Sequence, residues 1–320
     1  MKYILIMVFI LIVSCGEKKV KKDQKTMVIT EYKGVLSSGK IDRIKQFPSN
    51  NIVPRTVDVW LPKNYSKEKK YAVVYMHDGQ NLFDETSTWN QQEWKVDEIS
   101  TKLMNKGLVK PFIVVGIHSI AKSRFFDLYP KKALNYIPKK SLNSIFTIAE
   151  QNNHKMSLEL FNGDAYLKFI VEEVKPYVDK TYAVETNREN TFVAGSSMGG
   201  LMSMYAICEY PDVFSGAACL STHWIGMKWD KENTNLISNG FFRYIKDNMP
   251  AAKTHKFYFD FGTKSLDQYY VQFEDQVNVL FQSKGYTNEN FQNLKFEGAD
   301  HTELSWQKRF DIPLTFLLKK

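Results

Sequence analysis

Residues 191–200 read TFVAGSSMGG, and this stretch decides the fold that the sequence predicts. The short apolar run at its start is typical of a strand that is buried on both faces of a parallel sheet. Small residues follow, and an apolar pattern at helical spacing then continues from Met198 to Glu209. A buried strand that passes directly into a helix indicates one unit of an alternating α/β fold.

The turn between strand and helix contains the pattern Gly-x-Ser-x-Gly at residues 195–199. This pattern at a strand-to-helix turn is the nucleophile elbow of α/β-hydrolases. The serine of an elbow has a strained backbone, and the flanking glycines let strand and helix approach each other closely. Its hydroxyl projects above the sheet, where the following helix N-terminus favours developing negative charge. We therefore predict that Ser197 is a nucleophile.

Strand-like and helix-like segments alternate along the rest of the chain. The expected strands are 28–35, 57–61, 71–77, 112–117, 191–195, 215–220, 256–262 and 291–296, and the expected helices are 94–106, 166–179, 198–209, 237–248 and 266–284. This order predicts an α/β-hydrolase fold with a mostly parallel central sheet and helices on both faces. The first strands lack long helices between them and should form an antiparallel edge. Residues 118–162 have weak periodicity and should form an irregular lid insertion.

A serine hydroxyl needs a base to remove its proton, and the base needs an orienting acid. In this fold the chain order is serine, acid, histidine, so only His223, His255 and His301 can supply the base. His301 directly follows the last expected strand, where the catalytic loop falls. His255 precedes its strand and would lie at the opposite edge, and His223 leaves little room for an acid. We predict that His301 is the base and that His223 lines the pocket.

The acid is expected near the end of the next-to-last strand. Asp267, in the loop after that strand, suits the geometry best, and Asp260 inside the strand is the alternative. The oxyanion hole needs two backbone amides, of which one should belong to Met198, just after the nucleophile. The other should belong to Gln80, in the loop HDGQN at residues 77–81.

The expected insertion combines aromatic side chains with cations, which would suit a phenolic, siderophore-like or sugar compound with acidic groups. A solvated lysine-rich loop is the alternative. We expect Arg124 to contact the substrate, together with His223 and Trp224, although Trp224 could instead be a core residue. Patterns of metal ligands are absent from the sequence, so we expect neither a metal nor a cofactor. Cys208 and Cys219 should be buried core residues.

The first residues are typical of a secretory signal, because the apolar run is too short to cross a bilayer as a helix. Residues 12–15, IVSC, resemble a bacterial lipobox, which predicts that residues 1–14 are removed and that Cys15 carries the lipid. An ordinary signal peptide is the alternative. Residues 15–27 would form a lipid-anchored tether and residues 28–320 the α/β-hydrolase domain. This organisation predicts a location at the bacterial cell envelope, facing the periplasm or the cell surface.

The 320-residue chain carries a net charge of +8, which raises the question of acidic partners. Residues 17–25 hold five of the lysines and only two acids, so much of the positive excess belongs to the expected tether. No signature of an RNA-recognition, zinc-finger or helix-turn-helix module accompanies the remaining charge. We therefore expect a small-molecule or oligosaccharide substrate and a membrane anchor as partners, and no nucleic acid.

Three motifs together carry a resemblance to a known family. Residues 75–84 (YMHDGQNLFD), 195–201 (GSSMGGL) and 298–301 (GADH) occur in the order found in the putative esterase family, which includes enterochelin, feruloyl and acetyl-xylan esterases, esterase D and mycolyltransferases. The likeness runs from about Arg55 to Pro313.

The resemblance implies a serine esterase in which Ser197 attacks an ester carbonyl and water hydrolyses the acyl-enzyme. Residues 262–267 (GTKSLD) look like the acid loop of the family, but Ser265 stands where some members carry the acid. The choice between Asp267 and Asp260 therefore stays open. An acyltransferase on the same fold and a non-catalytic envelope-binding lipoprotein are the alternative functions.

Overall fold

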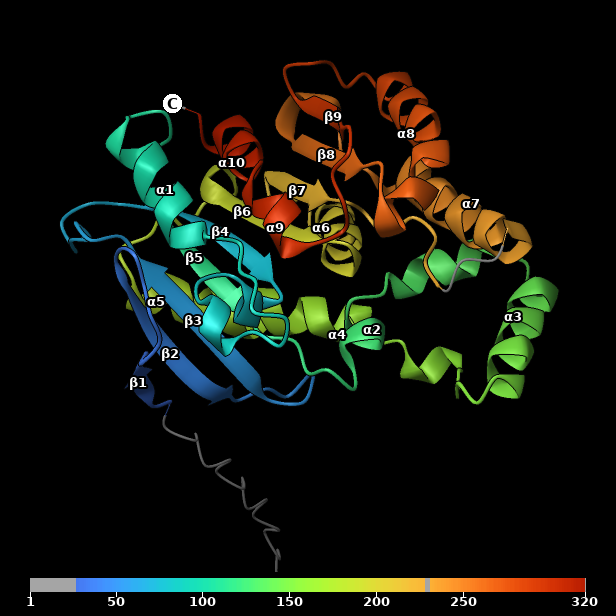
Figure 1. Cartoon of the computed structure of the whole chain (residues 1–320), viewed down its shortest axis with the longest axis horizontal. Helices are drawn as coiled ribbons and strands as arrows, with labels where there is room; N and C mark the ends of the chain where they lie inside the picture. The colour runs from blue at the N-terminus through green and yellow to red at the C-terminus, as the bar shows by residue number, and fades with distance from the viewer. Residues whose placement is uncertain (1–26, 228–230, 320) are drawn as a thin grey trace, which may run out of the picture.

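The computed structural model describes residues 27–227 and 231–319. Its strands are β1 (Ile29–Glu31), β2 (Lys40–Phe47), β3 (Arg55–Leu61), β4 (Ala72–His77), β5 (Phe112–Ile117), β6 (Thr191–Ser196), β7 (Gly216–Leu220), β8 (Lys256–Gly262) and β9 (Phe291–Phe296). Its α-helices are α1 (Val96–Asn105), α2 (Arg124–Asp127), α3 (Lys139–Gln151), α4 (Gly163–Lys168), α5 (Lys175–Thr181), α6 (Met198–Glu209), α7 (Lys231–Asn248), α8 (Val271–Ser283), α9 (Glu303–Gln307) and α10 (Asp311–Leu318). Figure 1 shows how these elements surround one sheet.

The sheet has the strand order β1-β2-β3-β5-β4-β6-β7-β8-β9. The pairs β1–β2, β2–β3 and β3–β5 are antiparallel, and every later pair is parallel. The prediction of a mostly parallel sheet with an antiparallel edge is therefore confirmed. Strand β2 was not predicted, because its register shifts between Ile44 and Phe47. This irregularity puts Ile44 and Phe47, three residues apart, into the same core, whereas Ile41 packs on the other face, so the buried residues do not show the two-residue period of a strand.

Alternate residues of the central strands enter two separate apolar cores, as the pleat of a sheet requires. Val73 and Tyr75 of β4 pack with α4, α5, α6, α7 and α8 on one face. Val74 and Met76 pack with α1 and α10 on the other, and these two helices lie side by side in Figure 1. Helices thus cover both faces, and the fold is that of an α/β-hydrolase.

The region 118–162 contains more regular structure than expected. It includes α2, α3 and a 3₁₀-helix at Lys131–Tyr136, which packs along α7. The rings of Phe125, Phe126 and Tyr129 pack against Phe161, with centroid distances of 4.7–6.2 Å. These ring contacts join α2 and Tyr129, which follows it, to the segment just before α4.

The predicted signal peptide, the lipid site at Cys15 and the tether up to residue 26 lie outside the described residues. Within the described part of the chain, none of the helices combines the length and apolarity needed to cross a membrane.

Candidate active site

The nucleophile elbow lies where β6 ends and α6 begins, and Ser197 is the residue between them. Its backbone has φ 56° and ψ −121°, a conformation that a non-glycine residue adopts only under strain. A Cβ atom on Gly195 would lie 2.8 Å from the carbonyl carbon of Gly199, so only glycine fits at this position. The Ser197 amide donates to the Leu220 carbonyl at 2.9 Å, which fixes the turn to β7. These features place Ser197 at the carboxyl edge of the parallel strands.

The loop after β4 packs against this elbow. A Cβ atom on Gly199 would lie 3.1 Å from the Cβ atom of His77, so the two segments touch. Asp78 has a left-handed backbone with φ 55°, and a 3₁₀-helix, Gly79–Asn81, follows it. Met198 begins α6, where backbone amides have no partner within the helix. The structure therefore brings the segments of Met198 and Gln80 to the same end of the sheet.

A cluster of polar side chains holds the Gln80 loop in place. Arg124 makes a double ion pair with Asp78, with Nε–Oδ1 and Nη2–Oδ2 distances of 2.7 and 2.8 Å. The Ser119 hydroxyl donates to Asp78 at 2.7 Å, and the Gln80 side chain accepts from the Ser119 amide at 3.0 Å. Burial raises the pKa of Asp78, but the Arg124 guanidinium outweighs it and leaves this pKa lowered. Arg124, expected to contact the substrate, is thus also a structural partner of this loop.

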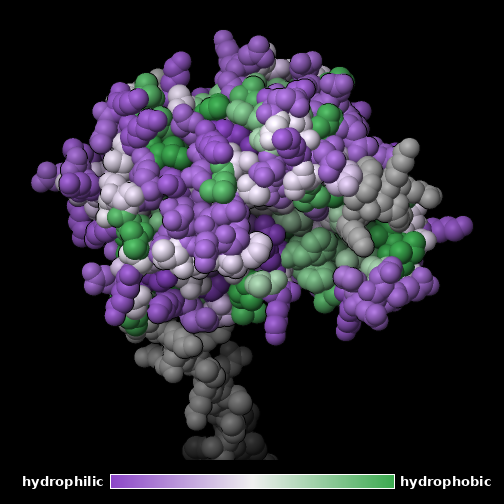
Figure 2. Space-filling model, viewed as in Figure 1, coloured by the Kyte–Doolittle hydropathy of each residue, from purple (hydrophilic) through white to green (hydrophobic). Residues whose placement is uncertain are grey.

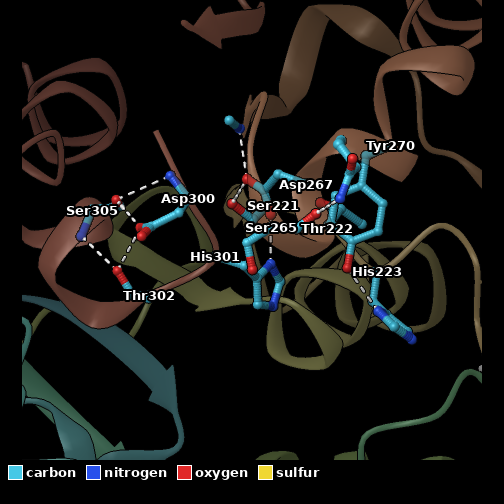
Figure 3. A network of polar contacts seen from close by, with 12 residues as sticks. Ser221, Thr222, His223, Ser265, Asp267, Tyr270, Asp300, His301, Thr302 and Ser305 are labelled. Atoms are coloured by element: carbon cyan, nitrogen blue, oxygen red, sulfur yellow. Dashed lines mark hydrogen bonds and ion pairs between the residues drawn. The ribbon is translucent and has the colours of Figure 1, made fainter. Parts of the chain in front are cut away.

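His301 contacts Asp267 directly. The Nδ1 atom of His301 lies 2.5 Å from Oδ1 of Asp267, and Asp267 is fully buried. The other carboxylate oxygen accepts from the Ser221 hydroxyl and the Gly262 amide, both at 2.6 Å. The His301 ring packs edge-on against Trp306 at a centroid distance of 5.0 Å. Figure 3 shows the imidazole directed at the carboxylate. This arrangement fixes the tautomer and orientation of His301, as a catalytic base requires.

Hydrogen bonds among Asp300, Thr302 and Ser305 fix the conformation of the loop that carries His301. Thr302 caps α9 by accepting from the Ser305 amide, and its hydroxyl donates to Asp300 at 2.7 Å. The Ser305 hydroxyl also donates to Asp300. Asp300 therefore orders the loop and does not contact the imidazole in the network that Figure 3 draws.

Asp260, the alternative acid, contacts Arg309 and Tyr258. Arg309 donates to its two oxygens at 2.9 and 3.1 Å, and the Tyr258 hydroxyl donates to it at 3.1 Å. Burial raises the pKa of Asp260, while the Arg309 charge opposes that shift. Ser221 connects the two acids, because its amide donates to Asp260 and its hydroxyl donates to Asp267. The geometry favours Asp267 as the partner of His301 and gives Asp260 a supporting role.

The sequence analysis did not identify two further residues of the site, Tyr270 and Ser221. Tyr270 is fully buried, its hydroxyl lies 2.8 Å from Nδ1 of His223, and its ring packs edge-on against the His301 ring at a centroid distance of 5.8 Å. Ser221 joins Asp260 to Asp267. A tyrosine or serine of this kind has no distinctive sequence pattern. Only the spacing of three residues between Asp267 and Tyr270 could have suggested that they share one face of a turn.

Two histidines of the site region are kept neutral by their surroundings. Burial, followed by the charges of His301 and Arg124, lowers the pKa of His223 to about 3. Burial also lowers the pKa of His77 to about 4, and Nδ1 of His77 contacts the Tyr166 hydroxyl at 2.8 Å. Neither histidine is therefore charged near neutral pH.

Trp224, expected either to contact the substrate or to be a core residue, lies in the core. Its side chain is 1% exposed and packs against Phe242 and Phe259 at centroid distances of 5.2 and 5.6 Å. An indole is compatible with either position in a sequence, and the core position is the one found. Cys208 and Cys219 are buried free thiols, as expected.

Figure 2 shows a hollow near α2 and α4 whose floor is mildly apolar, on the face also seen in Figure 1. Two cavities of about 430 and 450 Å³ lie instead against β1 and β2, and no residue of the elbow or of the His301 loop lines them. Among the described residues, no group of three or more His, Cys, Asp or Glu side chains is arranged to hold a metal ion.

Comparisons with known proteins bear on the family and the fold of the chain. The sequence model of the family described as "Putative esterase" matches residues 53–316. An endo-1,4-beta-xylanase/feruloyl esterase from Xylanibacter ruminicola is 21% identical over 283 residues, which are 87% of this chain and 31% of that protein. The chain thus spans less than a third of that relative. The ferri-bacillibactin esterase BesA of Bacillus subtilis is 25% identical over 161 residues, 48% of this chain and 49% of that protein.

Solved structures share the fold. A ferulic acid esterase superposes with a TM-score of 0.61 at 17% identity, over 88% of this chain and 98% of the other. The feruloyl esterase AmCE1/Fae1A of Anaeromyces mucronatus, solved with ferulic acid, has a TM-score of 0.59 at 18% identity, over 90% and 95%. The enterobactin esterase FES of Shigella flexneri has a TM-score of 0.59 at 15% identity, over 90% and 61%.

Proposed function

Since the chain belongs to the Putative esterase family and is a carboxylic ester hydrolase, we propose that it works through a Ser197–His301–Asp267 triad and a covalent acyl-enzyme. The observation that carries this proposal is the hydrogen bond between His301 and Asp267, on loops at the same sheet edge as the strained Ser197 elbow.

In the acylation step, Ser197 Oγ attacks the ester carbonyl while His301 Nε2 takes the hydroxyl proton. Asp267 accepts a hydrogen bond from His301 Nδ1 and stabilises the imidazolium that forms. The amides of Met198 and Gln80 donate to the negative oxygen of the tetrahedral intermediate. The intermediate collapses as the bond to the alcohol oxygen breaks, and His301 returns the proton to the leaving alcohol.

In the second step, water attacks the Ser197 ester while His301 Nε2 takes one of its protons. The bond between the acyl carbon and Ser197 Oγ breaks, and the proton passes from His301 to Oγ. The products are a carboxylic acid and the regenerated serine. The site needs no redox change or additional reactant for this sequence.

Hydrolysis of p-nitrophenyl acetate and labelling by a fluorophosphonate probe test the proposal. The wild-type protein should do both, and Ser197→Ala should do neither while it remains folded. Ser283→Ala, at the end of α8, is the matched control and should behave as wild type. An unreactive wild-type protein, or a Ser197→Ala variant with full turnover, would refute the proposed mechanism.

For the substrate, we propose an ester of an aromatic acid, of the feruloyl or the catecholate siderophore type. Named relatives of both types support this class, as does the mildly apolar hollow near α2 and α4. A panel of feruloyl, catecholate and acetyl-sugar esters should give kcat/KM values that are highest for the aromatic acyl groups. A clear preference for acetyl-sugar esters would contradict this class.

We also propose that Cys15 carries a lipid and anchors the domain to the bacterial cell envelope. Support comes from the sequence IVSC at residues 12–15 after an apolar run. Expression of the full chain in bacteria with an alkyne fatty acid should label the wild-type protein and not Cys15→Ser. Cys208→Ala, which changes a buried thiol, should keep the label. An unlabelled wild-type protein, recovered in the soluble fraction, would refute the anchor.

A further inference from the structure

Glu303 is the first residue of α9 and follows His301 by two positions. Its side chain is buried, and its carboxylate accepts hydrogen bonds from two other segments of the chain. Nδ2 of Asn81 donates to Oε1 at 3.2 Å, and Nδ2 of Asn90 donates to Oε2 at 2.8 Å. The loop that carries the candidate base is therefore joined directly to the segment between β4 and α1.

Asn81 connects Glu303 to the candidate oxyanion donor. It is the last residue of the 3₁₀-helix that contains Gln80, and its amide donates to the Asp78 carbonyl at 2.9 Å. Among the described residues, Oδ1 of the buried Asn81 side chain has no hydrogen-bond partner, so the bond from Nδ2 to Glu303 is the one that holds this side chain. Closely packed interiors transmit displacements, and a shift of the Asn81 side chain consequently moves the Gln80 turn.

The chemistry of the two asparagines selects a carboxylate at position 303. The Gln92 amide donates to Oδ1 of Asn90 at 3.3 Å, which leaves the Asn90 amino group to face Glu303. Asn81 also turns its amino group toward Glu303. A carboxylate has two acceptor oxygens and no donor, whereas a glutamine amide has only one acceptor oxygen. Glutamate can therefore satisfy both asparagines at once, and glutamine cannot.

We propose that Glu303 is a positioning residue that sets the Gln80 amide at its working distance from His301. This inference rests on the proposed function, because it takes His301 as the base and the Gln80 amide as an oxyanion donor. In the tetrahedral intermediate the amide contacts the negative oxygen while His301 holds the proton from Ser197. Both contacts must be correct at the same moment, and a misplacement of about 1 Å can lower the rate roughly a hundredfold.

Glu303→Gln tests this role. It leaves one of the two asparagines without an acceptor, so kcat on p-nitrophenyl acetate should fall roughly ten- to a hundredfold, with KM changed by less than about threefold. The kcat value is referred to the active sites titrated with a fluorophosphonate, so that unfolded molecules do not count. Glu189→Gln is the matched control, because this exposed glutamate precedes β6 at the opposite edge of the sheet and should leave kcat unchanged.

Reversing the polarity of one hydrogen bond should rescue the variant. Asn81→Asp alone places two carboxylates about 3.2 Å apart, and their repulsion should also lower kcat by roughly tenfold or more. In the double variant Asn81→Asp/Glu303→Gln, the new glutamine donates to the new aspartate, and its oxygen still accepts from Asn90. Both hydrogen bonds are restored, so kcat should return to within about fivefold of wild type, whereas independent losses would multiply.

The outcomes distinguish this inference from the proposed function. A wild-type protein without turnover overturns both. A wild-type protein that turns over overturns the inference alone if Glu303→Gln has the same kcat, or if this variant raises KM and keeps kcat, which would make Glu303 a substrate ligand. A double variant whose loss equals the product of the two single losses also overturns it. If Glu303→Gln does not fold, the Asn81→Asp variant is compared with the double variant, and a double variant that is no more active would overturn the inference.

Discussion

The Nδ1 atom of His301 lies 2.5 Å from Oδ1 of Asp267, and the second oxygen of this buried carboxylate accepts from Ser221 and Gly262. Three donors therefore converge on one acid. The hydrogen bonds from Ser221 and Gly262 fix the carboxylate, and the carboxylate fixes the imidazole. The predictions below follow from this arrangement and from the loops around it.

Asp267→Asn should lower kcat by about 10³- to 10⁴-fold, with a small change in KM. The amide presents N–H groups toward donors, so His301 loses the acceptor that selects its tautomer. Steady-state kinetics on p-nitrophenyl acetate measure the loss, and circular dichroism checks the fold. A folded variant with kcat close to that of wild type would show that Asp267 does not orient the base.

Asp260→Asn should lower the free energy of unfolding and leave kcat unchanged for the molecules that remain folded. It breaks the buried ion pair with Arg309, whose side chain is 3% exposed, at a cost of about 3–5 kcal/mol. Urea unfolding measures this loss. If Asp260→Asn instead abolished turnover at unchanged stability, the roles assigned to the two acids would be reversed.

Arg124→Ala should lower kcat by roughly ten- to a hundredfold, less than the direct removal of an oxyanion donor. The variant leaves the buried Asp78 carboxylate without its guanidinium, so the loop that carries Gln80 loses its fixed position. Arg188→Ala, at a half-buried arginine paired with the exposed Glu189, is the control and should have no effect. An increase in KM confined to acidic esters, with kcat preserved on a neutral ester, would identify Arg124 as a substrate ligand instead.

The buried His77 should make the free energy of unfolding depend on pH. Its pKa is lowered from 6.5 to about 4 by burial, so between these values the unfolded state binds more protons than the folded state. This stability contribution is complete above pH 6.5 and is lost as the pH falls toward 4, by up to about 3 kcal/mol.

The variant His77→Asn isolates this contribution, because asparagine does not titrate and can still contact the Tyr166 hydroxyl. Urea unfolding at pH 7 and pH 4.5 should show a smaller loss of stability for the variant than for wild type. Equal losses would mean that other groups account for the acid sensitivity.

The parts of the fold that depend on local patterns could be predicted from the sequence. Strand β6 and helix α6 are marked by a continuous apolar run and a glycine-flanked serine, which are short-range features. Strand β2 was missed because its bulge disrupts the alternation of buried residues. Helix α3 was missed although its apolar residues Leu142, Ile145 and Phe146 stand at helical spacing; it buries only Leu142 and Ile145.

The residues of the candidate site also fall into those that local sequence position predicts and those that depend on the tertiary structure. His301 could be proposed from its position after the last strand, and Asp267 from the loop after β8. Tyr270 and Ser221 could not, because their contacts depend on how separate segments meet in three dimensions. The position of Trp224 in the core could not be decided from the sequence for a related reason, since an indole suits a core and a binding surface equally well.

Intact-protein mass spectrometry tests the central claim most directly, that Ser197 forms a covalent acyl-enzyme. The protein is mixed with an aryl ester and quenched in acid within one turnover. We predict a mass increase of one acyl group that maps to Ser197 in the wild-type protein and is absent from Ser197→Ala. An acyl group on another residue, or turnover by Ser197→Ala at the wild-type rate, would contradict the account.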